Sequence, residues 1–213
     1  MTVMEDARRR EVTTVLFEGF EVLDVFGPLE VFGVAGQRFN LTMLGPEAGP
    51  VQSAQGPAAV AEVAYRDAPR PDIVLVPGGI GTRRLVTDVA FIEWLAGWAA
   101  PAELVTSVCT GSGVLAAAGL LSGYRATSNK RSFAWAREQG PLVDWVPEAR
   151  WVEDRDRWTS SGVAAGIDMA LALVAHLEGD ELAGAIADGV EHDWHRESNW
   201  DPFAEKNGLA PEP

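Results

Sequence analysis

The stretch 103–121, ELVTSVCTGSGVLAAAGLL, decides the fold of this chain. Its first part, LVTSV, is a short apolar and β-branched run that predicts a buried strand, and this strand leads directly into Cys109. Small residues occupy 110–113, and an apolar helical pattern follows them. A strand, a tight turn of small residues and a helix are typical of a nucleophile elbow, which lifts a reactive side chain above the sheet.

Cys109 is the one cysteine of the chain, so it forms no intramolecular disulfide. At an elbow, the positive end of the following helix favours the thiolate over the thiol, and the sulfur stays within reach of a substrate. The alternative is a small, inert, buried residue at the end of a central strand. The small residues that follow the strand favour the reactive interpretation.

Short apolar runs alternate with helical patterns along the rest of the chain, which indicates an α/β domain with a mainly parallel sheet. We expect strands at 12–17, 39–44, 73–76 and 104–108, and two short strands around a charged turn within 149–161. We expect helices at 28–36, 84–99, 113–121, 132–139, 165–177 and 181–194. The predicted organisation is one domain at 12–194 with tails at 1–11 and 195–213, the latter surface-bound or loose.

Composition excludes several classes of protein. The 213 residues are 47% hydrophobic, enough for one sizeable core. A net charge of −14 and a pI near 4.6 disfavour binding to nucleic acid and to anionic membranes. No apolar run approaches the roughly 20 residues of a transmembrane helix, and no apolar signal core follows the first residues. We therefore expect a cytoplasmic protein.

Two further segments supply candidate partners for the thiol. In 71–81, PDIVLVPGGIG, a buried strand ends at Gly78 and Gly79, whose N–H groups can approach a developing negative charge closely. In 22–28, VLDVFGP, Asp24 has apolar neighbours that favour its protonated form, which suits a proton donor. The alternative, that Asp24 only caps a helix beginning near Pro28, stays open.

Four segments together resemble one known family: LDVFGPLEVF, DIVLVPGGIGT, TSVCTGSGVLAAAGLLSGYRATSN and TSSGVAAGIDMALALVAHL. The chain resembles the ThiJ/PfpI superfamily of class I glutamine amidotransferase-like proteins over about 14–186. Within it, the chain is most similar to isocyanide (isonitrile) hydratases and to the amidotransferase-like domains of AraC-type regulators. The resemblance implies a flavodoxin-like three-layer sandwich, a nucleophile elbow and a homodimer.

The resemblance also implies roles for individual positions. Cys109 falls on the nucleophile and Asp24 on the acid that hydrogen-bonds it. The positions implied to surround the reacting atoms with backbone are Gly78, Gly79, Thr110, Gly162 and Val163.

Other positions weaken a histidine-based mechanism. Asn129 stands where such hydratases carry a histidine, and it cannot shuttle a proton near neutral pH. Asp168 matches the acid of the GID motif in these hydratases. Because it lies near the start of a predicted helix, we expect a structural role for it. We expect His176, near the end of a predicted helix, to be a packed or dipole-stabilised residue rather than a catalyst. His192 and His195 could contribute to a catalytic triad, an alternative that stays open.

No cofactor is expected from the sequence. His192 and His195 have no nearby companion ligand for zinc, and no phosphate-binding loop is present. The leading hypothesis is a metal-free cysteine lyase that hydrates an isocyanide to an N-substituted formamide, with a small electrophile as its partner. The alternatives are a ligand- or redox-sensing domain without turnover and a glyoxalase-like enzyme acting on 2-oxoaldehydes. Because about 20 residues follow the last predicted helix, we expect no helix-turn-helix pair.

Overall fold

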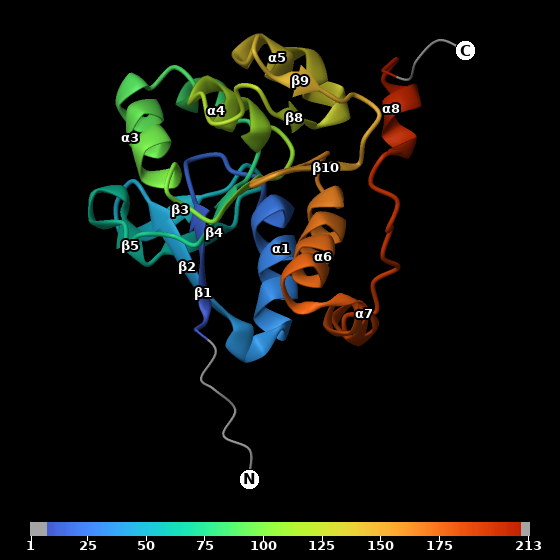
Figure 1. Cartoon of the computed structure of the whole chain (residues 1–213). Coiled ribbons are helices and arrows are strands. Elements are labelled where there is room, and N and C mark those ends of the chain that lie inside the picture. Colours follow the sequence, from blue (N-terminus) through green and yellow to red (C-terminus); the bar gives the residue numbers. More distant parts are fainter. Residues whose placement is uncertain (1–7, 210–213) are drawn as a thin grey trace.

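A seven-stranded, mainly parallel sheet forms the centre of the protein. The computed structural model describes residues 8–209 (Figure 1). The strand order is β10-β11-β7-β6-β1-β2-β5, and only β10 runs antiparallel to its neighbour. The strands are β1 (Arg10–Val15), β2 (Phe39–Gly45), β5 (Val63–Ala64), β6 (Ile73–Val76), β7 (Leu104–Ser107), β10 (Trp151–Asp154) and β11 (Arg157–Ser160). The predicted flavodoxin-like α/β fold is confirmed.

Helices cover both faces of this sheet, which gives three layers (Figure 1). One face carries α1 (Val22–Val34), α6 (Ala165–Glu178) and α7 (Asp180–Gly189). The other carries α2 (Thr82–Leu85), α3 (Val89–Ala99), α4 (Gly111–Ala117) and α5 (Phe133–Gln139). No helix within residues 8–209 combines the length and the apolar character needed to cross a membrane.

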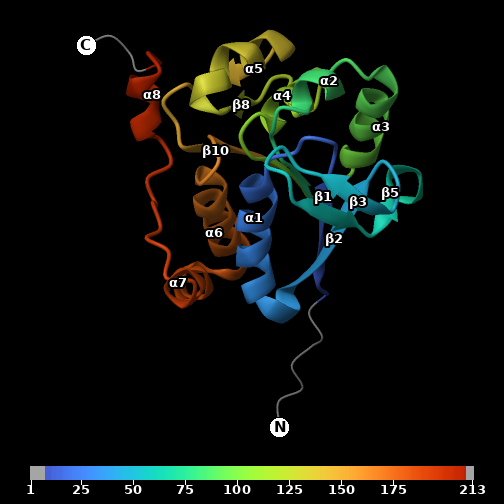
Figure 2. The same ribbon diagram turned by 180° about the vertical axis from the view of Figure 1, so that it is seen from behind.

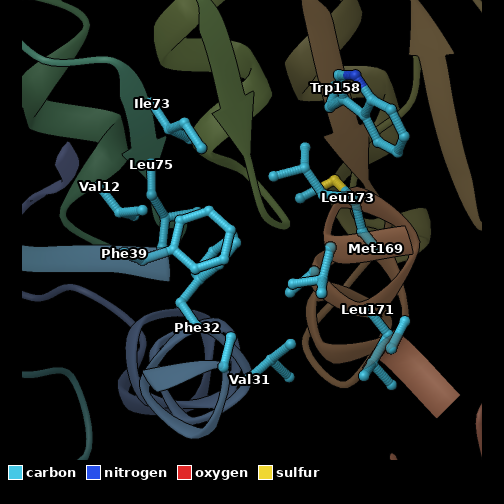
Figure 3. Close-up of a cluster of buried hydrophobic side chains, with 14 of the residues drawn as sticks. Val12, Val31, Phe32, Phe39, Ile73, Leu75, Trp158, Met169, Leu171 and Leu173 are labelled. Carbon is cyan, nitrogen blue, oxygen red and sulfur yellow. The ribbon is translucent and has the colours of Figure 1, made fainter. Parts of the chain in front are cut away.

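The side chains of β6 show why the apolar run predicted a fully buried strand. Ile73 and Leu75 join the core under α1 and α6, which Figure 3 shows from within. Val74 and Val76 point the other way, into the core under α3 and α4. Because successive side chains of a strand alternate between faces, a strand covered on both sides must be apolar at every position.

Several predicted helices differ from the structure, and one of them, 113–121, is α4, which begins at Gly111 and ends at Ala117. The first predicted helix begins at Val22 rather than at 28, so Pro28 lies inside α1. Proline is favoured in a first turn, which suggested the later start, but burial of residues such as Val25 and Phe32 stabilises the longer helix. The predicted helix 84–99 is two helices, because the Asp88 carboxylate accepts a hydrogen bond from the Phe91 N–H at 3.1 Å and starts α3 anew.

Several short elements had no prediction. They are the hairpin β3 (Gly49–Gln52) and β4 (Ala58–Ala61), the pair β8 (Arg125–Ala126) and β9 (Asp144–Trp145), the 3-10 helices η1 (Gly36–Arg38), η2 (Tyr65–Asp67) and η3 (Lys130–Ser132), and α8 (Pro202–Lys206).

The C-terminal segment, residues 190–209, packs against the domain rather than hanging loose (Figure 2). Helix α7 ends at Gly189, five residues before the predicted end at 194, and an extended stretch leads to α8. The Ser198 carbonyl accepts hydrogen bonds from the N–H groups of Arg150 at 2.7 Å and Trp151 at 3.2 Å. Asp201 and Ala204 are buried, so side chains hold this segment as well as backbone bonds.

Candidate active site

Cys109 lies at the sharp bend between β7 and α4 and has a φ of +59°, in the left-handed region. This conformation costs a non-glycine residue about 1–3 kcal/mol, so the surroundings must hold it. The Cys109 N–H donates to the carbonyls of Ser160, at 3.2 Å, and Ser161, at 3.1 Å. Its carbonyl accepts from the hydroxyls of Ser112, at 3.1 Å, and Ser128, at 3.0 Å. Hydrogen bonds to both the N–H and the carbonyl of Cys109 therefore fix the bend.

Two glycines at this bend allow close approach of the backbone. A Cβ on Gly111 would lie 2.1 Å from the Val76 carbonyl oxygen. A Cβ on Gly78 would lie 2.6 Å from the Thr110 nitrogen and 2.8 Å from Asp24 Oδ2. Any larger residue at Gly111 or Gly78 would push apart the strand ends that carry the candidate nucleophile and the candidate acid.

Asp24 projects from the first turn of α1 and is fully buried. Its Oδ2 accepts a hydrogen bond from the Gly78 N–H at 2.8 Å, and Oδ1 has no polar partner that meets hydrogen-bond geometry. Burial raises the pKa of the Asp24 carboxyl to about 8, and hydrogen bonds from Gly78 and from the Cys109 thiol oppose this shift only partly. The helix-capping interpretation is wrong, because Glu21 occupies the cap position. Asp24 is mainly a neutral acid at pH 7.

The Cys109 thiol is 6% exposed. Burial raises its pKa well above the ordinary value, and the nearby Asp24 adds to this shift. Hydrogen bonds from the Thr110 N–H and the Asn129 side chain lower the pKa by less. The expected thiolate is therefore wrong for the resting site: desolvation outweighs the dipole of α4, a helix of seven residues. Cys109 and Asp24 form a neutral pair of acids.

The backbone of the glycine turn is engaged within the protein. The Gly78 N–H donates to Asp24, and the Gly79 N–H donates to Thr110 Oγ1 at 3.0 Å. Both N–H groups were expected to face a developing charge on the substrate. Instead, the Gly78 N–H positions the Asp24 carboxyl and the Gly79 N–H positions Thr110. The Thr110 N–H is the backbone donor that reaches the sulfur.

Asn129 faces the site from the start of η3. Its Oδ1 accepts a hydrogen bond from the Ser132 N–H at 3.1 Å, which leaves the amide NH₂ for the thiol. A Cβ on Gly162 would lie 2.0 Å from Asn129 Nδ2, so the loop of Gly162 and Val163 lies against this amide. Asn129 and this loop line a cavity of about 400 Å³.

Sequence reasoning missed two contributions to this region. Phe203 of α8 and Asn207, which follows that helix, form part of the cavity wall, and the expectation of a surface-bound or loose tail assigned them no role. Arg83 of α2 lies over the ring of Trp135, with its Cζ 3.9 Å from the ring centroid. The sequence signal that could have indicated Arg83 was its position shortly after the glycine turn that follows β6.

The histidines do not bond to Cys109. His192 Nε2 lies 2.8 Å from Asp168 Oδ1 and the His195 ring stacks on Trp200, so within residues 8–209 neither ring pairs with Cys109 as a triad requires. Asp168 Oδ2 also accepts from Arg150 Nε at 2.7 Å, and Oδ1 accepts from the His195 N–H at 3.1 Å. Asp168 therefore anchors the C-terminal segment, in agreement with its expected structural role. His176 contacts Trp158 edge-on, but it is exposed and its Nδ1 lies 3.4 Å from Glu153 Oε1, so the expectation of a packed residue is wrong.

Comparison with known proteins places this geometry in context. The model of the DJ-1/PfpI family matches residues 10–176. An isonitrile hydratase from Pseudomonas putida is 34% identical over 184 residues, which cover 85% of this chain and 78% of the hydratase. The crystal structure of a ThiJ/PfpI family protein from Pseudomonas syringae superposes with a TM-score of 0.81 at 33% identity, covering 87% of this chain and 76% of that one.

A transcriptional regulator of the helix-turn-helix type, GbdR from Pseudomonas aeruginosa, is also similar, with 31% identity over 179 residues. The matched region covers 82% of this chain but only 48% of the regulator, so the chain spans about half the length of this relative. The same domain thus occurs in an enzyme and in a regulatory protein.

Proposed function

Because the chain belongs to the DJ-1/PfpI family, we propose that it is a cysteine-dependent lyase that hydrates an isocyanide to an N-substituted formamide. The observation that carries the proposal is the pairing of the Cys109 thiol with a buried carboxyl whose pKa is raised to about 8. An isocyanide must gain a proton on its terminal carbon as a nucleophile attacks that carbon. A thiol beside a protonated carboxyl offers both.

In the first step, the Cys109 sulfur forms a bond to the terminal isocyanide carbon. The Asp24 proton moves to that carbon while Asp24 takes the proton of the thiol, so the carboxyl is regenerated. The product is a thioimidate, R–N=CH–S–Cys109. The unpartnered Oδ1 of Asp24 gives this relay a free oxygen, since Oδ2 is held by Gly78.

In the second step, water adds to the thioimidate carbon. Asp24 accepts a proton from the attacking water, and the nitrogen gains one, which gives R–NH–CH(OH)–S–Cys109. The C–S bond then breaks, the hydroxyl proton leaves, and the sulfur is protonated again as R–NH–CHO departs. The sum is one isocyanide and one water converted to one formamide. The Thr110 N–H and the Asn129 amide stabilise charge on the sulfur as it leaves.

We also propose that Gly78, Gly79, Gly162 and Val163 shape the site through their backbone, and that the enzyme is a cytoplasmic homodimer that acts on small molecules rather than nucleic acid. The acidic net charge of −14 supports the exclusion of nucleic acid. Analytical ultracentrifugation tests the dimer.

A sensing domain without turnover is the second candidate, and its support is the likeness to GbdR. Assays with cyclohexyl isocyanide, methylglyoxal and a primary amide separate the possibilities. Formamide formation, with a transient mass increase on Cys109 equal to one isocyanide, is the expected result. Turnover of methylglyoxal alone would indicate a glyoxalase-like enzyme instead. No turnover, together with peroxide oxidation of Cys109 to the sulfinate, would overturn the hydratase and favour sensing.

A further inference from the structure

We propose that Arg83 selects substrates that carry a carboxylate, by binding this group next to Cys109. The inference rests on the proposed function for the reaction and adds the class of substrate: short isocyanides with an anionic group. Arg83 has no role in the chemical steps above.

Hydrogen bonds tie Arg83 on two sides to residues that neighbour Thr110 and Asn129. Its Nη1 donates to Thr82 Oγ1 at 2.9 Å; that hydroxyl donates to the Gly79 carbonyl at 2.7 Å and lies 3.3 Å from Thr110 Oγ1. Its Nη2 donates to Ser132 Oγ at 2.9 Å, and the Ser132 N–H bonds to Asn129. Thr110 and Asn129 are the two residues whose polar groups lower the pKa of the Cys109 thiol. The guanidinium therefore bridges the two flanks of the reactive thiol.

The Trp135 ring fixes the orientation of this guanidinium. Arg83 Cζ lies 3.9 Å from the ring centroid, a cation–π contact. The ring itself lies against the elbow helix, because a Cβ on Gly113 would be 2.6 Å from its Cζ3. Arg83 is thus held in place by the tryptophan and two hydroxyls, while its remaining N–H groups have no acceptor among residues 8–209.

Arg83 lacks the anionic partner that a half-buried cation normally has. Within residues 8–209, no carboxylate forms an ion pair with it. The other arginines without an ion pair in that part of the chain are exposed, namely Arg9, Arg70, Arg84, Arg125, Arg131 and Arg137. Desolvating a cation without a counter-charge is costly, and a planar guanidinium with free N–H groups fits a carboxylate closely. A carboxylate on the substrate would supply the missing partner.

Arg83 is also near enough to Cys109 to sense the charge that the sulfur carries when it ionises. Burial lowers the pKa of the Arg83 guanidinium, and negative charge on Cys109 opposes that shift. An anion bound at Arg83 would therefore lie near the Cys109 sulfur.

Kinetics with a matched pair of substrates tests the proposal. We expect wild-type protein to prefer isocyanoacetate over methyl isocyanoacetate, and Arg83→Gln to lower kcat/KM for isocyanoacetate about 10- to 100-fold, the range of a charged hydrogen bond. The ester should change less than about threefold, since it lacks the charge. Arg84→Gln is the matched control, because Arg84 is the exposed neighbour on α2. An equal loss for acid and ester, or the same loss in Arg84→Gln, would overturn the proposal.

A binding measurement separates this inference from the proposed function. Calorimetry with N-formylglycine and its methyl ester needs no turnover, and only wild-type protein and Arg83→Lys, which keeps the charge, should prefer the acid. Preferential binding without turnover of either isocyanide would sink the hydratase and leave the carboxylate site standing. If the isocyanides are turned over but neither measurement shows a preference for the acid, the carboxylate site would be overturned and the hydratase would stand. If Arg83→Gln lowers Tm, Arg83→Lys is compared with wild-type protein instead. We expect its preference for the acid over the ester to be weaker than that of wild-type protein but still present.

Discussion

Asp24 and Asp168 are both buried carboxylates in the first turns of helices, and these helices, α1 and α6, pack side by side (Figure 1). Their surroundings are opposite. Asp24 has one backbone donor and a thiol, and no cation. Asp168 has the Arg150 guanidinium, with Nη2 at 2.5 Å, and the His192 ring. Although the two residues occupy similar positions in the fold, Asp24 is an acid suited to proton transfer. Asp168 instead forms an ion pair suited to anchoring the C-terminal segment.

The difference shows that burial alone does not decide the role of a carboxyl group. Without a cation, burial favours the neutral form and creates a proton donor near neutral pH. With a guanidinium and further donors, the carboxyl group of Asp168 is paired and ties distant segments together. The following four predictions test this contrast, in order of decreasing effect.

Cys109→Ala should abolish formamide formation, because the step that forms the C–S bond is lost. The fold should persist, since the hydrogen bonds that hold the bend use the backbone of residue 109. Product formation followed by NMR, with circular dichroism for the fold, checks this. Wild-type turnover in the variant would overturn the covalent mechanism through Cys109.

Asp168→Asn should lower the free energy of unfolding by about 3–5 kcal/mol, because the buried Arg150 guanidinium loses its counter-charge. Urea denaturation measures the loss. The control is Asp180→Asn, which breaks the exposed pair with Arg196 and should cost at most about 1 kcal/mol. Equal effects of the two substitutions would show that the Asp168 cluster is no anchor.

Asp24→Asn should lower kcat/KM by about 100-fold, as expected for a lost acid-base group. Its effect on stability has the opposite sign to that of Asp168→Asn. The folded-state pKa of about 8 lies above the ordinary value of 3.8, so wild-type protein loses stability as pH rises from about 4 to about 8. Asparagine does not titrate, and the variant should become the more stable protein across this range. Urea titrations at pH 5 and pH 8 compare the two, and a variant less stable at both would contradict the assignment.

The pH profile of the wild-type enzyme gives the smallest effect. Above a pH of about 8, kcat/KM should fall about tenfold per pH unit, because the Asp24 carboxyl loses the proton that it donates. Asp24→Asn should lack this descending limb. A profile that rises through this region in wild-type protein would indicate that the reaction needs the ionised carboxyl.

Much of the fold could be predicted because its signals are local. The apolar run at 73–76 matches β6, and the run at 104–108 matches β7 to within one residue. Strands β8 and β9 have only two residues each, too few for any periodicity. The position of α8 depends on Asp201, whose carboxylate caps the helix at 2.9 Å, after a stretch without helical pattern.

The site was predictable in its residues and less so in their state. The small residues around Cys109 and the apolar neighbours of Asp24 indicated a nucleophile and a neutral acid. The protonation of the thiol depends on how deeply the folded chain buries it, which no local pattern reports. Arg83 and Phe203 reach the site only through tertiary packing, so the sequence alone placed neither of them.

The hydrogen bonds to Ser198 have a consequence for the behaviour of the protein in concentrated solution. Strand β10 is the last strand on its side of the sheet, and an unpaired outer strand invites pairing with another molecule. The Ser198 carbonyl occupies the N–H groups of Arg150 and Trp151, where such pairing would begin. The C-terminal segment thereby shields an aggregation-prone border, a protective task separate from any chemistry at the thiol.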